Sequence, residues 1–200
     1  MASADAAANT LCNPETEVSA HYLIAEDGTV TALVSEEQRA WHAGAGAWGD
    51  ITDVNSRSIG IELSNTGFAP FAAAQIDALT DLLSGVMSRW AIPPQRVIGH
   101  SDMAPARKID PGPRFDWRRL ALSGLSVWPQ IADGHSLNDD EFVQLMHCFG
   151  FTATDDPELL LATLRRRFRP RHDGPRDGTD AAIIRDLVAR FPVDGTGGTP

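Results

Sequence analysis

The fold is decided by residues 96–113, which read Arg96-Val-Ile-Gly-His-Ser-Asp-Met-Ala-Pro-Ala-Arg-Lys-Ile-Asp-Pro-Gly-Pro113. Val97 and Ile98 end an apolar run, which predicts a buried strand that stops at the glycine after them. The residues beyond this glycine include three prolines and a second glycine, so neither a helix nor a central strand is expected there. We therefore expect a strand that leads the chain into a stiff loop.

This loop carries three groups that can act in catalysis: the His100 imidazole, the Lys108 ammonium and the Asp110 carboxylate. A neutral imidazole and a carboxylate are both zinc ligands, and a catalytic zinc takes three protein ligands and keeps one position open. The Lys108 ammonium could stabilise an oxygen that becomes negative during a reaction. The alternative is an ordinary polar loop with a solvated lysine. Three such groups in one proline-braced loop favour a metal-dependent active site.

A second acidic group interrupts the apolar segment that reads Ile59-Gly-Ile-Glu-Leu63. A carboxylate within an apolar strand costs free energy unless it is paired or functional. Beside a metal-bound water, Glu62 could accept the proton during attack, with a pKa raised by its apolar surroundings. The alternative is a glutamate on an edge strand that faces solvent.

The two segments together resemble a known family. The pattern His-Ser-Asp-x-Ala-Pro-x-Arg-Lys-x-Asp-Pro-Gly-Pro resembles the type 2 family of zinc-dependent N-acetylmuramoyl-L-alanine amidases, and the segment with Glu62 is similar to that family's catalytic strand. The resemblance implies an α/β fold, in which a mixed central β-sheet is flanked by helices. It also implies hydrolysis of the bond between N-acetylmuramic acid and L-alanine, in peptidoglycan or anhydromuropeptides, during turnover or recycling of the bacterial cell wall.

The resemblance also implies roles for individual residues and a Zn²⁺ cofactor. Two residues match the family's metal ligands, His100 and Asp110. Two others match its catalytic groups, Glu62 and Lys108. Four residues match positions that contact the substrate, namely Trp41, His42, Ala104 and Arg107. The alternative for His42 is a histidine satisfied within the core, while Trp41 and Trp48 could both stack against a sugar or the peptide stem.

The family's first metal ligand has no counterpart in this chain. That ligand is a histidine in a His-Tyr-Thr-like strand, before the helix that matches residues 3–12, and no histidine here precedes His21. His21 itself matches a position that is structural in the family. Either the chain begins at an internal methionine and the first strand lies upstream, or the zinc site is incomplete. The second case corresponds to another class of protein, a non-catalytic, metal-deficient amidase derivative that binds peptidoglycan.

Composition excludes several other classes. The net charge is −10 and the pI about 4.9, which disfavours a nucleic-acid partner. No apolar run reaches the ~20 residues of a transmembrane helix, and the start lacks the pattern of a signal peptide. We therefore expect a cytoplasmic monomer, or a periplasmic protein if the true N-terminus lies upstream. Cys12 and Cys148 lie in different apolar segments and are expected to be buried free thiols.

The 200 residues are expected to form two parts. An amidase domain over 1–130 should contain helices and strands in the order helix 3–12, hairpin 18–34, strand 58–63, helix 70–92, the strand at Val97, and helix 115–125. After a linker over 128–138, three amphipathic helices should form a second unit over 138–192. This unit resembles the three-helix peptidoglycan-binding domain that follows some of these amidases. The alternative is a helical cap on the first domain. The cluster Arg165–Arg171 is expected to be a solvated helix end instead of a ligand site.

Overall fold

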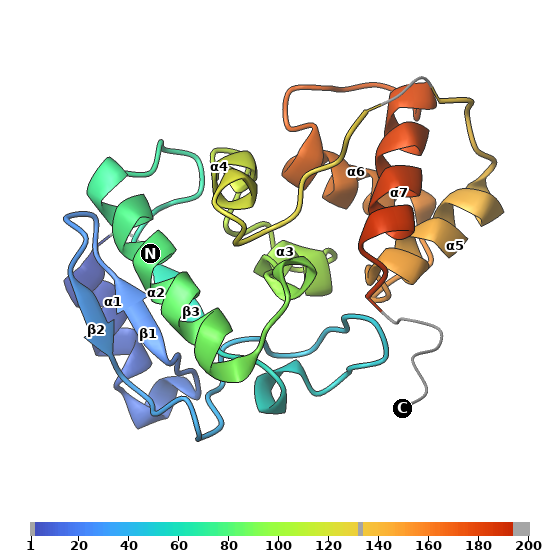
Figure 1. The fold of residues 1–200 in the computed structure, drawn as a ribbon. Coiled ribbons are helices and arrows are strands. Elements are labelled where there is room, and N and C mark those ends of the chain that lie inside the picture. Colours follow the sequence, from blue (N-terminus) through green and yellow to red (C-terminus); the bar gives the residue numbers. More distant parts are fainter. Residues whose placement is uncertain (1–2, 132–133, 194–200) are drawn as a thin grey trace.

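The structure, a computed structural model, describes residues 3–131 and 134–193 (Figure 1). The strands are β1 (Tyr22–Ile24), β2 (Val30–Ala32) and β3 (Ile61–Leu63). The helices are α1 (Ala4–Leu11), η1 (Pro14–Thr16), η2 (Val54–Ser56), α2 (Ala73–Trp90), η3 (Pro94–Arg96), α3 (His100–Met103), α4 (Trp117–Leu122), α5 (Asp139–Phe149), α6 (Pro157–Phe168) and α7 (Gly178–Arg190). The sheet order is β2-β1-β3, with β1 antiparallel to β2 and parallel to β3. The predicted α/β class with a mixed sheet flanked by helices is confirmed, although each strand is shorter than predicted.

Helices cover both faces of the sheet. Ile24, Ile61 and Leu63 pack against the apolar stripe of α2, whereas Leu23 packs beneath α1. Side chains alternate between the two faces along a strand, and residues in register on neighbouring strands share a face. Glu62 is in register with Leu23, so β3 presents this carboxylate on the face of the sheet that carries α1.

The predicted hairpin forms at the Asp27-Gly28 turn. Gly28 has a φ of +88°, which favours glycine, and a Cβ at this position would lie 2.8 Å from the carbonyl oxygen of Ala74 in α2. The Asp27 carboxylate accepts a hydrogen bond from the backbone N–H of Thr29. Glycine therefore provides both the turn conformation and the close approach of the hairpin to α2.

The segment around residue 97 differs from its prediction. Val97 and Gly99 have extended backbone angles but belong to no strand, and His100 begins a single helical turn, α3. The carboxylate of Asp102 accepts the Gly99 N–H at 2.8 Å, which closes this turn before the first proline of the loop. The carbonyl of Val97 accepts a hydrogen bond from Arg167 and not from a neighbouring strand. The predictions of a strand at 97 and of a loop directly after it were therefore wrong.

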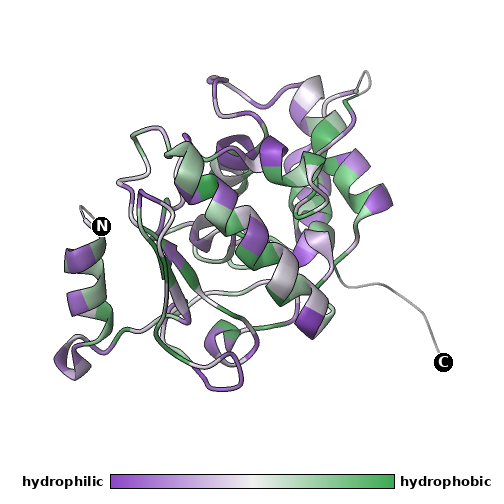
Figure 2. Ribbon diagram, turned by 60° about the vertical axis from the view of Figure 1, so that its left-hand side comes forward, coloured by the Kyte–Doolittle hydropathy of each residue, from purple (hydrophilic) through white to green (hydrophobic). Residues whose placement is uncertain are grey.

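The three predicted C-terminal helices are confirmed as α5, α6 and α7. Each begins at an acidic or amide side chain that accepts backbone N–H groups of the first turn, namely Asn138, Asp156 and Asp177. Hydrophilic and hydrophobic residues alternate along the helical ribbons (Figure 2), as expected for helices that bury one face.

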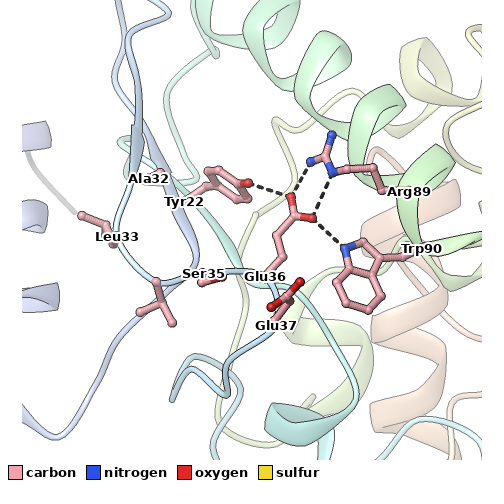
Figure 3. A pocket seen from close by; sticks show the side chains of 9 residues that line it. Tyr22, Ala32, Leu33, Ser35, Glu36, Glu37, Arg89 and Trp90 are labelled. Carbon is pink, nitrogen blue, oxygen red and sulfur yellow. Dashed lines mark hydrogen bonds and ion pairs between the residues drawn. The ribbon is translucent and has the colours of Figure 1, made fainter.

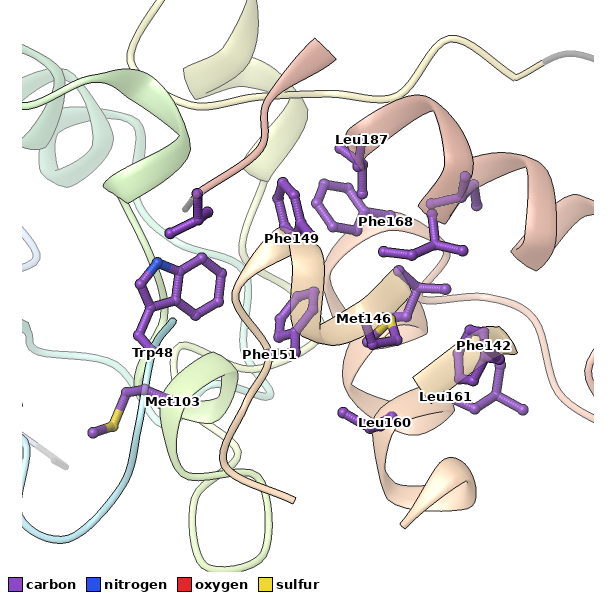
Figure 4. Close-up of a cluster of buried hydrophobic side chains, with 14 of the residues drawn as sticks. Trp48, Met103, Phe142, Met146, Phe149, Phe151, Leu160, Leu161, Phe168 and Leu187 are labelled. Atoms are coloured by element: carbon purple, nitrogen blue, oxygen red, sulfur yellow. The ribbon is translucent and has the colours of Figure 1, made fainter. Parts of the chain in front are cut away.

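These helices share one core with the first part of the chain (Figure 4). The Trp48 ring lies edge-on to Phe149 and Phe151, with centroid distances of 5.8 and 5.2 Å. Met103, the last residue of α3, belongs to the same cluster. One hydrophobic core thus contains residues from both sides of the predicted linker. Separate folding of 138–192 remains a prediction of the sequence.

Three further predictions about burial are corrected by the packing. Cys12 and Cys148 are free, as predicted, but exposed: Cys12 follows the last residue of α1, and Cys148 lies on an exposed position of α5. In the arginine cluster, Arg165 and Arg167 are buried, because both form ion pairs inside the core. Trp48 is only 5% exposed and cannot stack on a ligand in this arrangement. Within the described residues, no helix combines the length and apolar composition of a membrane span.

The shared core predicts one cooperative unfolding transition. Trp48→Ala should lower the free energy of unfolding by about 3–5 kcal/mol, because the substitution leaves a cavity between the two parts. Urea unfolding followed by both fluorescence and circular dichroism measures this loss. Trp41→Ala, at a position that is 54% exposed, is the control and should change stability by roughly 0.5 kcal/mol or less. Two separate transitions would instead support independent folding of 138–192.

Candidate active site

The predicted ligands His100 and Asp110 meet at the start of α3. Nδ1 of His100 lies 3.0 Å from Oδ2 of Asp110, and Nε2 lies 2.8 Å from the carbonyl oxygen of Ala43. A carbonyl can only accept, so Nε2 carries a proton and donates it. In the neutral ring the Nδ1 lone pair then faces the carboxylate. Two hydrogen-bond acceptors this close need a proton or a metal cation between them. An imidazole nitrogen and a carboxylate oxygen are both suitable ligands for a metal cation.

The loop returns to α3 through backbone contacts. The Ser101 N–H donates to the carbonyl oxygen of Asp110 at 2.9 Å. A Cβ on Gly99 would lie 2.7 Å from the Pro111 ring, so only glycine permits this close return. Burial favours the protonated form of Asp110, but the hydrogen bond and charge of His100 outweigh it and lower the pKa of this carboxyl. Asp110 is therefore kept ionised, as a metal ligand requires.

Glu62 faces the same pair of residues from β3. Its side chain is half-buried, and burial raises its pKa above the ordinary value of 4.5. The negative charge of Asp110 raises this pKa further, whereas His100 and Lys108 oppose the rise. Glu62 therefore lies within electrostatic range of Asp110, His100 and Lys108, although it comes from a separate segment; we refer to the four residues as one electrostatic cluster. The raised pKa expected for Glu62 is confirmed.

Lys108 is half-buried and supplies the cluster with a positive charge. Its backbone N–H donates to the Ala104 carbonyl at 3.0 Å, which fixes the loop conformation before Asp110. Among the described residues, its ammonium makes no ion pair within 4.0 Å. The charge is therefore available to an oxygen that becomes negative in a reaction.

His42 and His21 lie in contact, with ring centroids 5.5 Å apart. His21 is buried and structural, as predicted, because its Nδ1 accepts the Gly60 N–H and its Nε2 donates to the Gln38 carbonyl. Burial, and then the nearby His21, lower the pKa of His42 to about 4, so this ring is neutral near pH 7. Its Nε2 is buried and has no hydrogen-bond partner among the described residues. His42 is thus not a satisfied core histidine.

The other residues predicted to contact the substrate have different environments. Trp41 is exposed, and the Arg39 guanidinium lies 3.9 Å from its ring centroid. Ala104 is 4% exposed and its side chain packs in the core, so its contact with a substrate remains a prediction. Arg107 donates to the carbonyls of Ala43 and Ala45, so its guanidinium fixes the loop that holds His100.

Asn55 contributes to the site but was missed by sequence analysis. Its side-chain oxygen accepts the backbone N–H groups of His42 and Ala43, at 3.0 and 2.8 Å. The carbonyl of Ala43 is in turn the acceptor for His100. A single asparagine in a polar loop carries no local signal for this role, since both of its partners are at least 12 residues away.

A different hollow, between β2 and the end of α2, contains a second polar cluster (Figure 3). Glu36 accepts hydrogen bonds there from the Tyr22 hydroxyl at 2.6 Å, from the Trp90 indole at 2.6 Å and from Arg89. The Arg89 hydrogen bond is the largest of the effects that lower the pKa of Glu36 to about 2. Because these polar groups already satisfy one another, the cluster locks the hairpin to α2 and is not the candidate active site.

Among the described residues, the site provides two candidate metal ligands. His100 and Asp110 fit the donor types of a catalytic zinc, which takes three protein ligands. Within residues 3–131 and 134–193, no three His, Cys, Asp or Glu side chains converge on one position. The described residues thus match part of a zinc site, and no third ligand is assigned.

Comparisons with known proteins agree with this geometry. Residues 1–113 match the family described as N-acetylmuramoyl-L-alanine amidase. The chain is 33% identical to the N-acetylmuramoyl-L-alanine amidase AmiD of Escherichia coli K12, over 89% of this chain and 76% of that protein. It is 42% identical to the 1,6-anhydro-N-acetylmuramyl-L-alanine amidase AmpD of Haemophilus influenzae, over 53% of this chain and 58% of that protein.

Two solved structures extend the similarity through the C-terminal helices. The Escherichia coli AmiD complex with anhydro-N-acetylmuramic acid-L-Ala-D-γ-Glu-L-Lys superposes with a TM-score of 0.86 and 33% identity, covering 94% of this chain and 84% of that one. AmpDh3 of Pseudomonas aeruginosa, in complex with anhydromuramic pentapeptide, has a TM-score of 0.81 and 29% identity, over 94% and 88%. Both matches therefore include α5 to α7 as well as the sheet.

The raised pKa of Glu62 predicts a pH-dependent gain in stability when this residue is replaced. Folding favours the protonated form, so the native chain should lose stability as the pH rises from 4.5 through the higher pKa of the folded state. Glu62→Gln does not ionise. It should raise the free energy of unfolding at pH 7, and this gain should vanish near pH 4.

Urea unfolding at several pH values measures this effect. Glu26→Gln, which removes the same charge at an exposed position, serves as the control and should show no comparable gain. A Glu62→Gln protein that is less stable than the native chain at pH 7 would contradict the assigned environment.

Proposed function

Because this chain belongs to the N-acetylmuramoyl-L-alanine amidase family, we propose that it hydrolyses the amide bond between N-acetylmuramic acid and L-alanine in peptidoglycan fragments. The observation that carries the proposal is the meeting of Glu62, His100, Lys108 and Asp110 in one electrostatic cluster. The ligands in the AmiD and AmpDh3 complexes support an anhydromuropeptide as the substrate. The product pair is then an anhydromuramic acid and a peptide with a free L-alanine amine.

The proposed reaction adds one water molecule across the C–N bond. Glu62, ionised but with a raised pKa, accepts a proton from the water as its oxygen attacks the amide carbonyl carbon. The carbonyl oxygen becomes negative, and the Lys108 ammonium stabilises it. Glu62 then gives the proton to the nitrogen, and the C–N bond breaks to leave a carboxylic acid and an amine. A carboxyl with a raised pKa is suited to both transfers.

Zinc is proposed as the cofactor, with His100 Nδ1 and Asp110 Oδ2 as two of its ligands. A zinc ion bound there would polarise the substrate carbonyl and the attacking water. The hydrogen bond from Nε2 to Ala43 would orient the imidazole for binding, as outer contacts do at zinc sites.

A second candidate function is a peptidoglycan-binding protein without catalysis. One observation favours it: the described residues provide two metal ligands where a catalytic zinc takes three. A half-buried carboxylate with a raised pKa, near an ammonium that has no ion pair among the described residues, favours the enzyme, because binding alone requires neither group. Turnover of an anhydromuropeptide, followed by release of the free peptide, separates the two candidates.

Replacing the proposed base tests the mechanism. Glu62→Gln should lower the rate of amide hydrolysis roughly 10²-fold or more. Its zinc content under saturating metal should match that of the native chain, because Glu62 is not assigned as a ligand. The released L-Ala-peptide is measured by chromatography, and Glu26→Gln is again the matched control. Hydrolysis by Glu62→Gln at the native rate would remove this residue from the proposed mechanism.

Weak retention of zinc is the second expectation. With two protein ligands, the chain should bind added Zn²⁺ but lose it during dialysis. Metal analysis before and after dialysis, for the native chain and for His100→Ala, measures the loss. One zinc retained per chain would show that a third ligand exists, and His42→Ala would then be the next variant, since the Nε2 of His42 is buried and has no hydrogen-bond partner among the described residues.

A further inference from the structure

Arg167 of α6 reaches across the predicted linker into the segment that carries His100. Its side chain is 1% exposed. Its guanidinium donates to Oδ2 of Asp102 at 2.5 Å, to the Val97 carbonyl at 2.9 Å and to the Ser126 hydroxyl at 3.1 Å. The same group stacks 4.2 Å from the centroid of the Trp117 ring. One C-terminal side chain thus contacts four separate positions in the first part of the chain.

Asp102 connects this arginine to the active site. The same oxygen of Asp102 that accepts from Arg167 also accepts the Gly99 N–H, at 2.8 Å. Together, Arg167 and Asp102 bind the backbone on both sides of Ile98, at the Val97 carbonyl and the Gly99 N–H. His100 is the next residue along the chain. The backbone that delivers the His100 imidazole is therefore fixed by one buried ion pair.

The helical turn of α3 cannot maintain this geometry alone. It contains four residues, and a helix so short is not stable without tertiary contacts. Removing Arg167 would leave the carboxylate of Asp102, which is 2% exposed, without its cationic partner in the core. A buried unpaired charge is strongly unfavourable, so Asp102 would turn toward water and release the Gly99 N–H. The direction of the His100 ring would then change.

We propose that Arg167 is a positioning residue for His100. Through Asp102 and the Val97 carbonyl, it fixes the turn that directs Nδ1 of His100 toward Asp110. The importance of this geometry for catalysis rests on the proposed function, in which His100 is a zinc ligand. The C-terminal helices thereby contribute to the active site, in addition to any affinity for peptidoglycan.

The chain offers a matched control for a purely structural role. Arg165 lies on the same helix and forms a buried ion pair of the same length, 2.5 Å, with Asp180. Its side chain is 9% exposed and that of Asp180 is fully buried. This second pair joins α6 to α7, and none of the hydrogen bonds that Arg165 makes to the described residues reaches α3. Loss of either pair should destabilise the protein, but only loss of the first should move His100.

The experiment compares the full-length native chain, Arg167→Met, Arg167→Lys and Arg165→Met without metal at one fixed pH. The ring ¹⁵N–¹H correlations of His100, assigned by their absence in His100→Gln, report the position and hydrogen bonding of the imidazole. Arg167→Met should shift these signals, whereas Arg165→Met should leave them at the native positions. Arg167→Lys keeps the positive charge but not the planar guanidinium, so the shift of the His100 signals should be smaller than in Arg167→Met but still detectable. If Arg167→Met does not fold, Arg167→Lys alone carries the comparison.

Kinetic measurements with Zn²⁺ and an anhydromuropeptide test whether the position of His100 affects catalysis. Arg167→Met should lower kcat roughly 10²-fold, the effect of a small displacement of a catalytic group, with a much smaller change in KM. Unchanged His100 signals in a folded Arg167 variant, or an equal shift in Arg165→Met, would overturn the proposal. If the native chain shows no turnover, the proposed function fails, but the metal-free spectra still decide whether Arg167 positions His100.

Discussion

The carboxylate of Asp102 receives hydrogen bonds from two directions, the Gly99 N–H within its own turn and the Arg167 guanidinium from α6. Both donors are buried, and so is the carboxylate. A buried carboxylate is stable only when its hydrogen bonds and its charge are satisfied together, so α3 and α6 constrain each other. The His100 loop and the C-terminal helices are therefore parts of one structure, as the core around Trp48 also indicates.

The two carboxylates beside His100 are kept in different states by their surroundings. Asp110 lies next to the imidazole and has a lowered pKa, whereas the pKa of Glu62 is raised by partial burial and by the charge of Asp110. Environments that separate the pKa values of two neighbouring acids mark a division of roles. The acid with the lowered pKa suits metal binding, and the acid with the raised pKa suits proton transfer.

The hydrogen-bond and ion-pair partners of the polar side chains distinguish the candidate active site from the cluster around Glu36. Around Glu36, hydroxyl, indole and guanidinium groups all donate to one carboxylate, which leaves little for a ligand to bind. Around His100, the Lys108 ammonium has no ion pair and Nε2 of His42 has no hydrogen bond among the described residues. A binding site is expected where polar groups lack partners, because a substrate or an ion can then provide them.

Local patterns in the sequence were enough for most of the elements and, together with the family resemblance, for the candidate residues of the motif. The Asp27-Gly28 turn, the apolar stripe of α2, and the residues Glu62, His100 and Asp110 are all recognisable from nearby neighbours, since periodicity and loop composition are local properties. Tertiary structure alone decided that Trp48 is buried, that residues after 99 form a helical turn, and that Arg167 enters the core. Each of these outcomes depends on partners far along the chain: the contact of Arg167 with Asp102 joins residues 65 positions apart. A local pattern carries no information about such a partner, so the coupling of the C-terminal helices to His100 becomes visible only in the folded chain.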